Sequence, residues 1–347
     1  ELPIYKAGTS GDATRTRSDW RLTTAEKKRI LLNNIYGVDI DQAAVEVTKL
    51  SLLLKVLEEE NEENISKQLK LFAERALPSL HENIKCGNSL IGTDILTPEM
   101  PADEVKRINP FDWDREFADV MKAGGFDAVI GNPPYVRQEI LGQEFKDYAK
   151  TRYETNSGTA DLYVFFFEKA HALLRKAGYF SMISSNKFMK ANYGKNLRNF
   201  LTKKTKIIEI VDFGELPVFQ NASTFPTIVL FQNLSIPEQS FTYSPIKELN
   251  LLSLSENVKE NGKTIDSRAL GENIWTLTDS QDTIVIEKMK KHGVPLGQYV
   301  KDEVFRGIVT GFNDAFIIDG KCRTELIKKD PKSENVIKRF VIGNDIR

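Results

Sequence analysis

Short apolar strands that alternate with helical stretches constrain most strongly what this chain can fold into. Strands are predicted over 35–40, 84–86, 126–130, 179–184, 207–213 and 227–232. Helices are predicted over 42–60, over 161–176 and near 281–291. The first helix carries an apolar stripe of Val45, Val47, Leu50, Leu53, Leu54 and Leu57. This alternation predicts an α/β fold with a mostly parallel sheet. Because no helix is obvious between the last two strands, we expect them to form an antiparallel pair at the sheet edge.

Composition favours a globular chain of about two domains, since 347 residues divide at roughly 150 per domain. The longest apolar runs are far shorter than a membrane span, so no membrane association is expected. Cys86 and Cys322 are the only cysteines, which excludes a disulfide scaffold and indicates a reducing, cytoplasmic compartment. The amino-acid composition becomes more polar after about Glu248. We therefore expect one domain over 1–248 and the start of a second over 249–347.

Charge is distributed unevenly along the chain. The total is nearly balanced, with 48 basic and 49 acidic residues. Between Val136 and Ile207, however, 14 Lys and Arg side chains stand against 6 Asp and Glu, an excess of eight positive charges. A basic middle indicates one face that meets a polyanion, although a solvated helix face rich in lysine explains the charge about as well.

The segment Asn132-Pro133-Pro134-Tyr135 carries the chemistry. It directly follows a predicted strand, and ligands of open α/β sheets bind at the carboxyl ends of strands. Two consecutive prolines stiffen the backbone and remove two N–H donors. The Asn132 side chain and the Pro133 carbonyl then form a rigid pair of acceptors beside an aromatic ring. Such a pair suits a planar exocyclic amine, and a base in a duplex would have to be flipped out to reach it. A proline turn that merely ends the strand is the alternative.

Residues 126–135 resemble the signature loop of S-adenosylmethionine-dependent amino-methyltransferases. More specifically, the chain resembles the gamma-class N6-adenine DNA methyltransferases of type IIG restriction–modification enzymes. The resemblance extends over nearly the whole chain, with the segments 35–44, 84–91, 126–135, 159–184 and 304–316 in the order of the family. It implies a Rossmann-like methyltransferase sheet followed by part of a mixed α/β target-recognition domain. It also implies S-adenosylmethionine as the methyl donor, no metal for methyl transfer, and double-stranded DNA as the partner.

The resemblance assigns roles to individual residues. The catalytic segment is Asn132, Pro133, Pro134 and Tyr135, with Tyr135 and Phe219 stacking on the target base. Asp39 matches the acid that binds the ribose of the cofactor, although either Asp39 or Asp41 could simply cap the following helix. The cofactor set comprises Asp39, Ile40, Asn88, Ser89 and Asn132. Many members carry Asp at the position of Asn88. Phe219 is the weaker assignment, since a single phenylalanine is more often part of a core.

The main departure from the family is the glycine-rich cofactor loop. The family places this loop before the strand that ends at Asp39, and no such pattern is found here, so we expect it to lie before Glu1. The segment 305–314 resembles the start of the target-recognition domain. DNA contacts are therefore expected from Arg137, Arg306, Thr310 and Asn313. A plain hairpin explains the segment 305–314 equally well.

Other chemistries find little support in the sequence. His81, His171 and His292 lack metal-ligand spacing, and neither cysteine stands in the Pro-Cys context of cytosine-C5 methyltransferases. We find no nuclease motif, and a nuclease domain would lie elsewhere in the parent protein. The sequence thus predicts a site-specific adenine-N6 DNA methyltransferase. A non-catalytic DNA-recognition subunit, or a methyltransferase that acts on protein glutamine or RNA, remains the alternative.

Overall fold

The computed structural model describes residues 4–6, 20–57, 78–219, 225–235, 240–250, 253–267, 270–277, 285, 288–289, 291–300 and 316–339. The chain divides into two compact units, Glu1–Ser280 and Gln281–Arg347, and each is described by itself.

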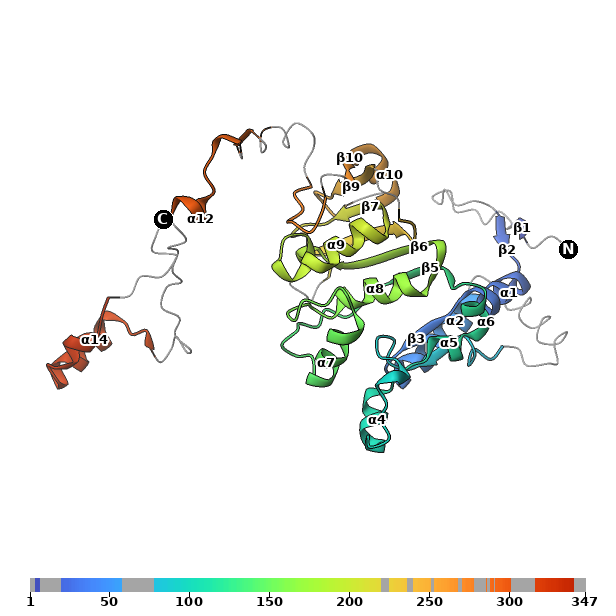
Figure 1. The fold of residues 1–347 in the computed structure, drawn as a ribbon, viewed down its shortest axis with the longest axis horizontal. Coiled ribbons are helices and arrows are strands. Elements are labelled where there is room, and N and C mark those ends of the chain that lie inside the picture. The colour runs from blue at the N-terminus through green and yellow to red at the C-terminus, as the bar shows by residue number, and fades with distance from the viewer. Residues whose placement is uncertain are drawn as a thin grey trace, which may run out of the picture. The chain divides into compact units, whose positions relative to one another are not determined.

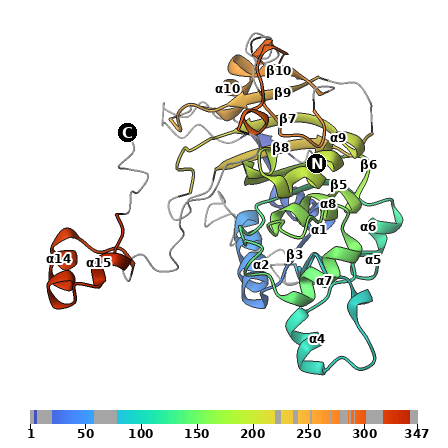
Figure 2. The ribbon, with the colours of Figure 1, turned by 60° about the vertical axis from the view of Figure 1, so that its left-hand side comes forward.

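A six-stranded sheet forms the centre of the first unit (Figure 1). Its strands are β5 (Phe126–Gly131), β6 (Leu174–Ser185), β7 (Lys206–Asp212), β8 (Pro226–Gln232), β9 (Ser240–Pro245) and β10 (Lys263–Asp266). They lie in the order β10-β9-β7-β8-β6-β5, and most of this succession can be followed in Figure 2. β5 is parallel to β6 and β7 to β9, whereas β8 is antiparallel to both β6 and β7. Four strands therefore run in one direction, in agreement with the predicted α/β class.

The last two predicted strands, β7 and β8, do form the expected antiparallel pair. The expectation that this pair lies at the sheet edge is wrong. β8 lies inside the sheet, because β9 pairs with the other edge of β7 and β10 continues the sheet beyond β9. The sequence between 233 and 250 shows no strand pattern strong enough to have placed β9 there.

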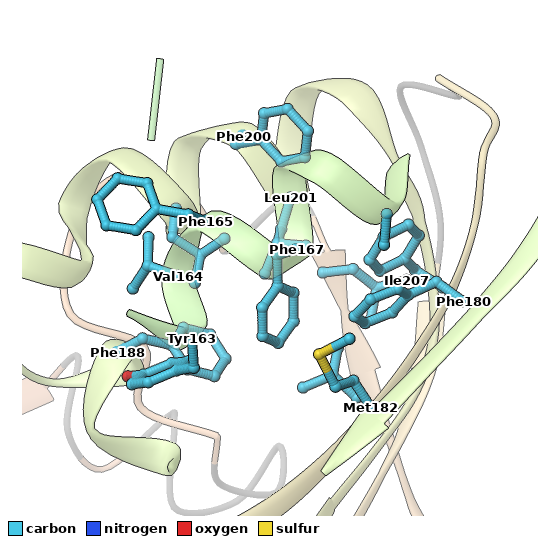
Figure 3. Packing of buried hydrophobic residues seen from close by; sticks show 14 of the residues in the cluster. Tyr163, Val164, Phe165, Phe167, Phe180, Met182, Phe188, Phe200, Leu201 and Ile207 are labelled. Carbon is cyan, nitrogen blue, oxygen red and sulfur yellow. The ribbon is translucent and has the colours of Figure 1, made fainter. Parts of the chain in front are cut away.

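Two layers of side chains cover the faces of this sheet. Helices α8 (Tyr163–Leu173) and α9 (Lys195–Lys204) pack on β6 and β7 over one face. In that layer the rings of Phe180 and Phe231 stack at 4.2 Å, and Figure 3 shows Phe167 and Phe180 in the same cluster. Helix α10 (Leu254–Asn261) places Val258 against Val211 of β7, whereas the preceding Ile210 belongs to the α8–α9 layer. This alternation is the period of two that a sheet covered on both faces requires.

The amino-terminal part of the unit contains two smaller sheets. β1 (Ile4–Lys6) pairs antiparallel with β2 (Trp20–Leu22), and β3 (Gly37–Asp39) pairs parallel with β4 (Ile84–Cys86). Helices α1 (Thr24–Asn34), α2 (Gln42–Leu57), α4 (Ala102–Ile108), α5 (Trp113–Glu116), α6 (Ala118–Lys122) and the short helix η1 (Thr93–Ile95) complete this region. In the described part of the chain, β3 and β5 each pair along one edge, with β4 and β6 respectively.

Helix α2 divides its apolar residues between two surroundings. Val45 is 1% exposed and belongs to a small core with Leu31 and Ile84, and Leu53 packs against that core. Val47, Leu50 and Leu54 are more than half exposed, so the predicted apolar stripe is buried only in part.

The first compact unit extends past residue 248, where the sequence analysis places a domain boundary. β10 completes the sheet, and Trp275 is 2% exposed within the main core. The guanidinium of Arg198 donates to the carbonyl of Glu272 at 2.8 Å. The second unit contains α12 (Leu296–Tyr299), α14 (Gly320–Lys329) and α15 (Ser333–Val336). The helix predicted near 281–291 lies largely outside the described residues.

Candidate active site

Three strands of the large sheet end at the same edge. β5, β6 and β7 run in one direction and end at Gly131, Ser185 and Asp212. The segment 132–135 leaves β5 at this edge, where Gly131 is paired with Met182. The structure therefore places the predicted catalytic segment where open α/β sheets bind ligands.

The acceptors of this segment are unengaged. Asn132 is exposed and Pro133 is buried. Neither the Asn132 side chain nor the Pro133 carbonyl accepts a hydrogen bond from a residue that the structure describes. Both acceptors thus have no hydrogen-bond partner within the described part of the chain.

Tyr135 and Phe219 come together although 84 residues separate them in the sequence. Their ring centroids lie 5.9 Å apart with planes at 59°. The Tyr135 hydroxyl is buried and has no hydrogen-bond partner among the described residues. Burial raises the pKa of Tyr135, so the phenol keeps its proton at neutral pH. The rings of Tyr135 and Phe219, here called the aromatic wall, thus meet at the segment that carries the two unengaged acceptors.

A second group of predicted site residues lies at the carboxyl ends of β3 and β4. Asp39 is in register with Cys86, and the Gly87 N–H donates to the Asp39 carbonyl at 2.9 Å. These contacts bring Asp39 and Ile40 beside Asn88 and Ser89. The Cys86 thiol donates to the Ile40 carbonyl at 3.5 Å, so it holds the same corner.

The two acids of this corner have different roles. Asp41 caps α2, since its Oδ1 accepts from the Ala43 N–H at 2.8 Å. Asp39 accepts the Asp41 N–H on Oδ1 at 2.8 Å, and its Oδ2 has no partner among the described residues. Asp39 is exposed, and Ile40 beside it is 56% exposed. The helix-capping alternative therefore applies to Asp41, and a free carboxylate oxygen remains on Asp39.

Asn88 turns the chain at the end of β4. Its Oδ1 accepts from the Leu90 N–H at 3.1 Å, and its backbone N–H donates to the Asn109 carbonyl at 2.6 Å. At Gly87 an added Cβ would lie 2.5 Å from the Phe111 ring, so the close approach of Phe111 requires glycine there.

Comparisons with known proteins identify the family of the chain. Residues 33–219 match the family described as Eco57I restriction-modification methylase. The chain belongs to this family. It is 30% identical over 320 residues to the type II restriction enzyme and methyltransferase RM.Eco57I of Escherichia coli, covering 91% of this chain and 29% of that protein. It is 29% identical over 228 residues to the type II methyltransferase M.BstVI of Geobacillus stearothermophilus, covering 60% of this chain and 39% of that protein.

The solved structure of the type IIL restriction-modification enzyme MmeI in complex with DNA has the same fold. It superposes with a TM-score of 0.54 at 15% identity, covering 90% of this chain and 37% of that chain. The chain spans less than two fifths of the length of these relatives.

In this member of the Eco57I methylase family, helix α7 (Gln143–Arg152) and the residue after it hold the turn that follows Asn88. The Tyr148 hydroxyl accepts from the Gly92 N–H and donates to Asp94, both at 2.9 Å. The Tyr153 hydroxyl donates to the Leu90 carbonyl at 2.6 Å. Sequence reasoning missed both tyrosines, because no local pattern shows which distant turn a helix contacts.

The residues predicted to contact DNA fall into two groups, those that the structure describes and those that it does not. Arg137 is exposed just after the catalytic segment. Arg306, Thr310 and Asn313 lie outside the described residues.

Within the described ranges, no group of His, Cys, Asp and Glu side chains could hold a metal ion. None of the helices in the described part has the length and apolar content that a membrane crossing requires.

Proposed function

We propose that this chain carries the catalytic part of a restriction–modification DNA methyltransferase, which moves a methyl group from S-adenosylmethionine to the N6 amine of a flipped adenine. The observation that carries the proposal is the pair of unengaged acceptors on Asn132 and Pro133 at the end of β5, beside the rings of Tyr135 and Phe219. The relatives are methyltransferases, and one related structure is bound to DNA.

The two acceptors suit an amino group that is a weak nucleophile. The Asn132 side-chain oxygen and the Pro133 carbonyl would each accept a hydrogen bond from one N–H of the adenine amine. Holding both hydrogens shifts electron density to nitrogen and directs its lone pair out of the ring plane. The amine then forms its N–C bond to the methyl group as the C–S bond breaks, and its extra proton passes to water. The protein supplies position and electrostatics, without a covalent intermediate on the enzyme.

The aromatic wall explains how an extrahelical base would be held. Stacking of a base on an aromatic ring contributes about 1–3 kcal/mol and tolerates any base. Tyr135 and Phe219 would therefore hold the flipped adenine, while the two acceptors select its amino edge.

The β3–β4 corner fits the nucleoside end of the methyl donor. S-adenosylmethionine, when bound, supplies a methyl group on a positively charged sulfur. The free Oδ2 of Asp39 suits two ribose hydroxyls, and the exposed Ile40 suits the face of a purine. Asn88 and Ser89 line the same corner from the end of β4, and Asn132 would contact the methyl donor from the base side.

DNA contacts complete the proposal. Arg137 follows the catalytic segment and would meet a phosphate near the flipped base. We assign target recognition to the region predicted over 249–347, including Arg306, Thr310 and Asn313. Residues 254–277 of that region also support the catalytic sheet. A nuclease domain would belong to another part of the parent protein.

The decisive experiment supplies the intact protein with deuterium-labelled S-adenosylmethionine and unmethylated duplex DNA. The DNA is digested to nucleosides and analysed by mass spectrometry. We expect N6-methyladenosine in its deoxy form, and a loss of about 10²–10³-fold or more in rate for Asn132→Ala with DNA binding retained. Binding should weaken steeply with salt, since phosphate contacts release counterions.

Two results would contradict the proposal. DNA binding without any methylated nucleoside favours a recognition subunit. Absence of DNA binding favours a methyltransferase for protein glutamine or RNA.

A further inference from the structure

The far end of the catalytic segment is held by residues that the proposed function does not use. The segment leaves β5 on a paired strand, but residues 132–142 form no helix or strand until α7 begins at Gln143. The Leu162 N–H donates to the Val136 carbonyl at 3.0 Å, and the Gln138 N–H donates to Oδ1 of Asp161 at 3.3 Å. These two bonds anchor the exit of the segment to the start of α8.

Asp161 also reaches a third segment. Its Oδ2 accepts from the Tyr193 hydroxyl at 3.2 Å, and that hydroxyl lies 3.1 Å from the hydroxyl of Tyr163. Tyr163 is 1% exposed at the first turn of α8. Burial, together with the Asp161 carboxylate, raises the pKa of Tyr193 to about 12, so its hydroxyl remains a donor at neutral pH.

Tyr193 itself stands on a firmly held turn. It lies in η3 (Asn192–Gly194), which follows β6 and η2 (Asn186–Met189). Arg198 is 3% exposed, and its Nη1 donates to the carbonyls of Phe188 at 2.5 Å and Ala191 at 2.8 Å. The chain of contacts therefore leads from the core of the large sheet to the exit of the catalytic segment.

Asp161 links the exit of the catalytic segment to the turn that carries Tyr193. Among the described residues, Asp161 is the one side chain from outside residues 132–142 that accepts a hydrogen bond from their backbone. Two bonds at the exit keep the acceptors in one geometry, whereas without the Asp161 bond only the Leu162–Val136 bond holds the exit and the acceptors would sample several. Displacement of a reacting geometry by about 1 Å lowers a rate by about 10²-fold.

We propose that Asp161, supported by Tyr193, is a positioning residue that fixes the exit of the Asn132–Tyr135 segment for methyl transfer. This inference rests on the proposed function. It predicts a defect in the methyl-transfer step that is separate from the binding of S-adenosylmethionine.

The test compares three variants with a matched control in the intact protein. Single-turnover methylation is measured at saturating S-adenosylmethionine and duplex DNA, beside the affinity for S-adenosylmethionine and the melting temperature. Asp161→Ala should lower the rate about 10–100-fold with cofactor affinity changed less than about twofold. Asp161→Asn should restore most of the rate, because the amide oxygen still accepts the Gln138 N–H. Tyr193→Phe should lower the rate several-fold.

The control is Tyr243→Phe, which removes a bond of the same kind and length elsewhere at this edge. The Tyr243 hydroxyl donates to Oδ2 of Asp212 at 3.2 Å, and the other hydrogen bonds of Asp212 come from Asn186 and Gly214, outside residues 132–142. The control should retain the rate within about twofold.

The outcomes separate this inference from the proposed function. A wild-type protein that methylates no DNA overturns both. A normal wild-type rate with an unchanged Asp161→Ala rate overturns the positioning role alone. Equal losses in Asp161→Ala, Asp161→Asn and Tyr243→Phe, in proportion to melting temperature, show a purely structural bond and overturn it as well. If Asp161→Ala does not fold, the Asn and Tyr193→Phe variants decide.

Discussion

The two sides of the candidate site are supported in different ways. The base side, with residues 132–135, rests on six strands whose core includes Phe180, Val229 and Phe231, each 0% exposed. The cofactor side, with Asp39 and Asn88, rests on two three-residue strands and a small separate core around Val45. The base side is therefore supported by a large core, with the Asp161 bond added at the exit of its segment. The cofactor side has a smaller core of its own, and Tyr148 and Tyr153 add polar contacts to its turn, where Leu90 packs into the main core.

The largest expected difference is in core stability. Phe180→Ala removes a ring stacked at 4.2 Å on Phe231 and should cost about 3–5 kcal/mol. Val45→Ala, in the smaller core, should cost about 2 kcal/mol. Hydrogen exchange after each substitution locates the loss. We expect lower protection in β6–β8 for Phe180→Ala, and in β3–β4 for Val45→Ala. Equal loss of protection on both sides for Val45→Ala would show that the two sides are one cooperative unit.

Next in size is the loss of the free carboxylate on the cofactor side. Asp39→Asn should weaken S-adenosylmethionine binding about 10–100-fold, since a hydrogen bond to a charged group contributes roughly 1.5–3 kcal/mol. DNA binding should not change. Titration calorimetry provides the measurement, and Asp41→Asn is the matched control, because it makes the same charge change two residues away at the α2 cap. Equal weakening in both variants would indicate a general charge effect rather than a ribose contact.

A smaller effect is expected for the link between the two sides. Tyr148→Phe deletes the hydroxyl that bonds both Gly92 and Asp94, which costs about 1–2 kcal/mol. The β4 turn should then be held less firmly, so S-adenosylmethionine binding should weaken several-fold without a change in DNA affinity. Tyr179→Phe, in β6, serves as the control, since its hydroxyl has no bond to a described residue. Unchanged binding in Tyr148→Phe would show that the cofactor side supports itself.

The smallest predicted effect is a pH dependence of protein stability that arises from His171 on the base side. Burial lowers the pKa of His171, which packs on Phe200 at 5.1 Å, although Glu154 and Glu168 favour its charged form. The unfolded chain then binds a proton more readily than the folded one, so stability is complete above the ordinary pKa near 6.5 and falls as the pH drops below it. Melting temperatures at pH 7.5 and 5.5 should differ less for His171→Gln than for the wild type. The same difference in both proteins would assign the effect to other groups.

Much of the site follows from the sequence because it is local. Asn132–Tyr135 follow a strand that Gly131 and two prolines end, and Asp39 and Asn88 follow strands in the same way. The carboxyl ends of parallel strands meet at an edge, so a residue placed just after such a strand already has an approximate position in space. Backbone propensity and covalent adjacency were sufficient to place these residues, whereas the roles proposed for Asp39 and Asn88 come from the family resemblance.

Only the tertiary structure decided which distant segments meet. The position of β8 inside the sheet, the exposure of Val47 on α2, and the bond between Asp161 and Tyr193 all depend on packing between residues far apart in the sequence. Such contacts have no local signature, because a side chain's own neighbours do not specify the surface that it will cover. The sequence determined where the candidate groups lie relative to the strands, and long-range packing decided what holds them in place.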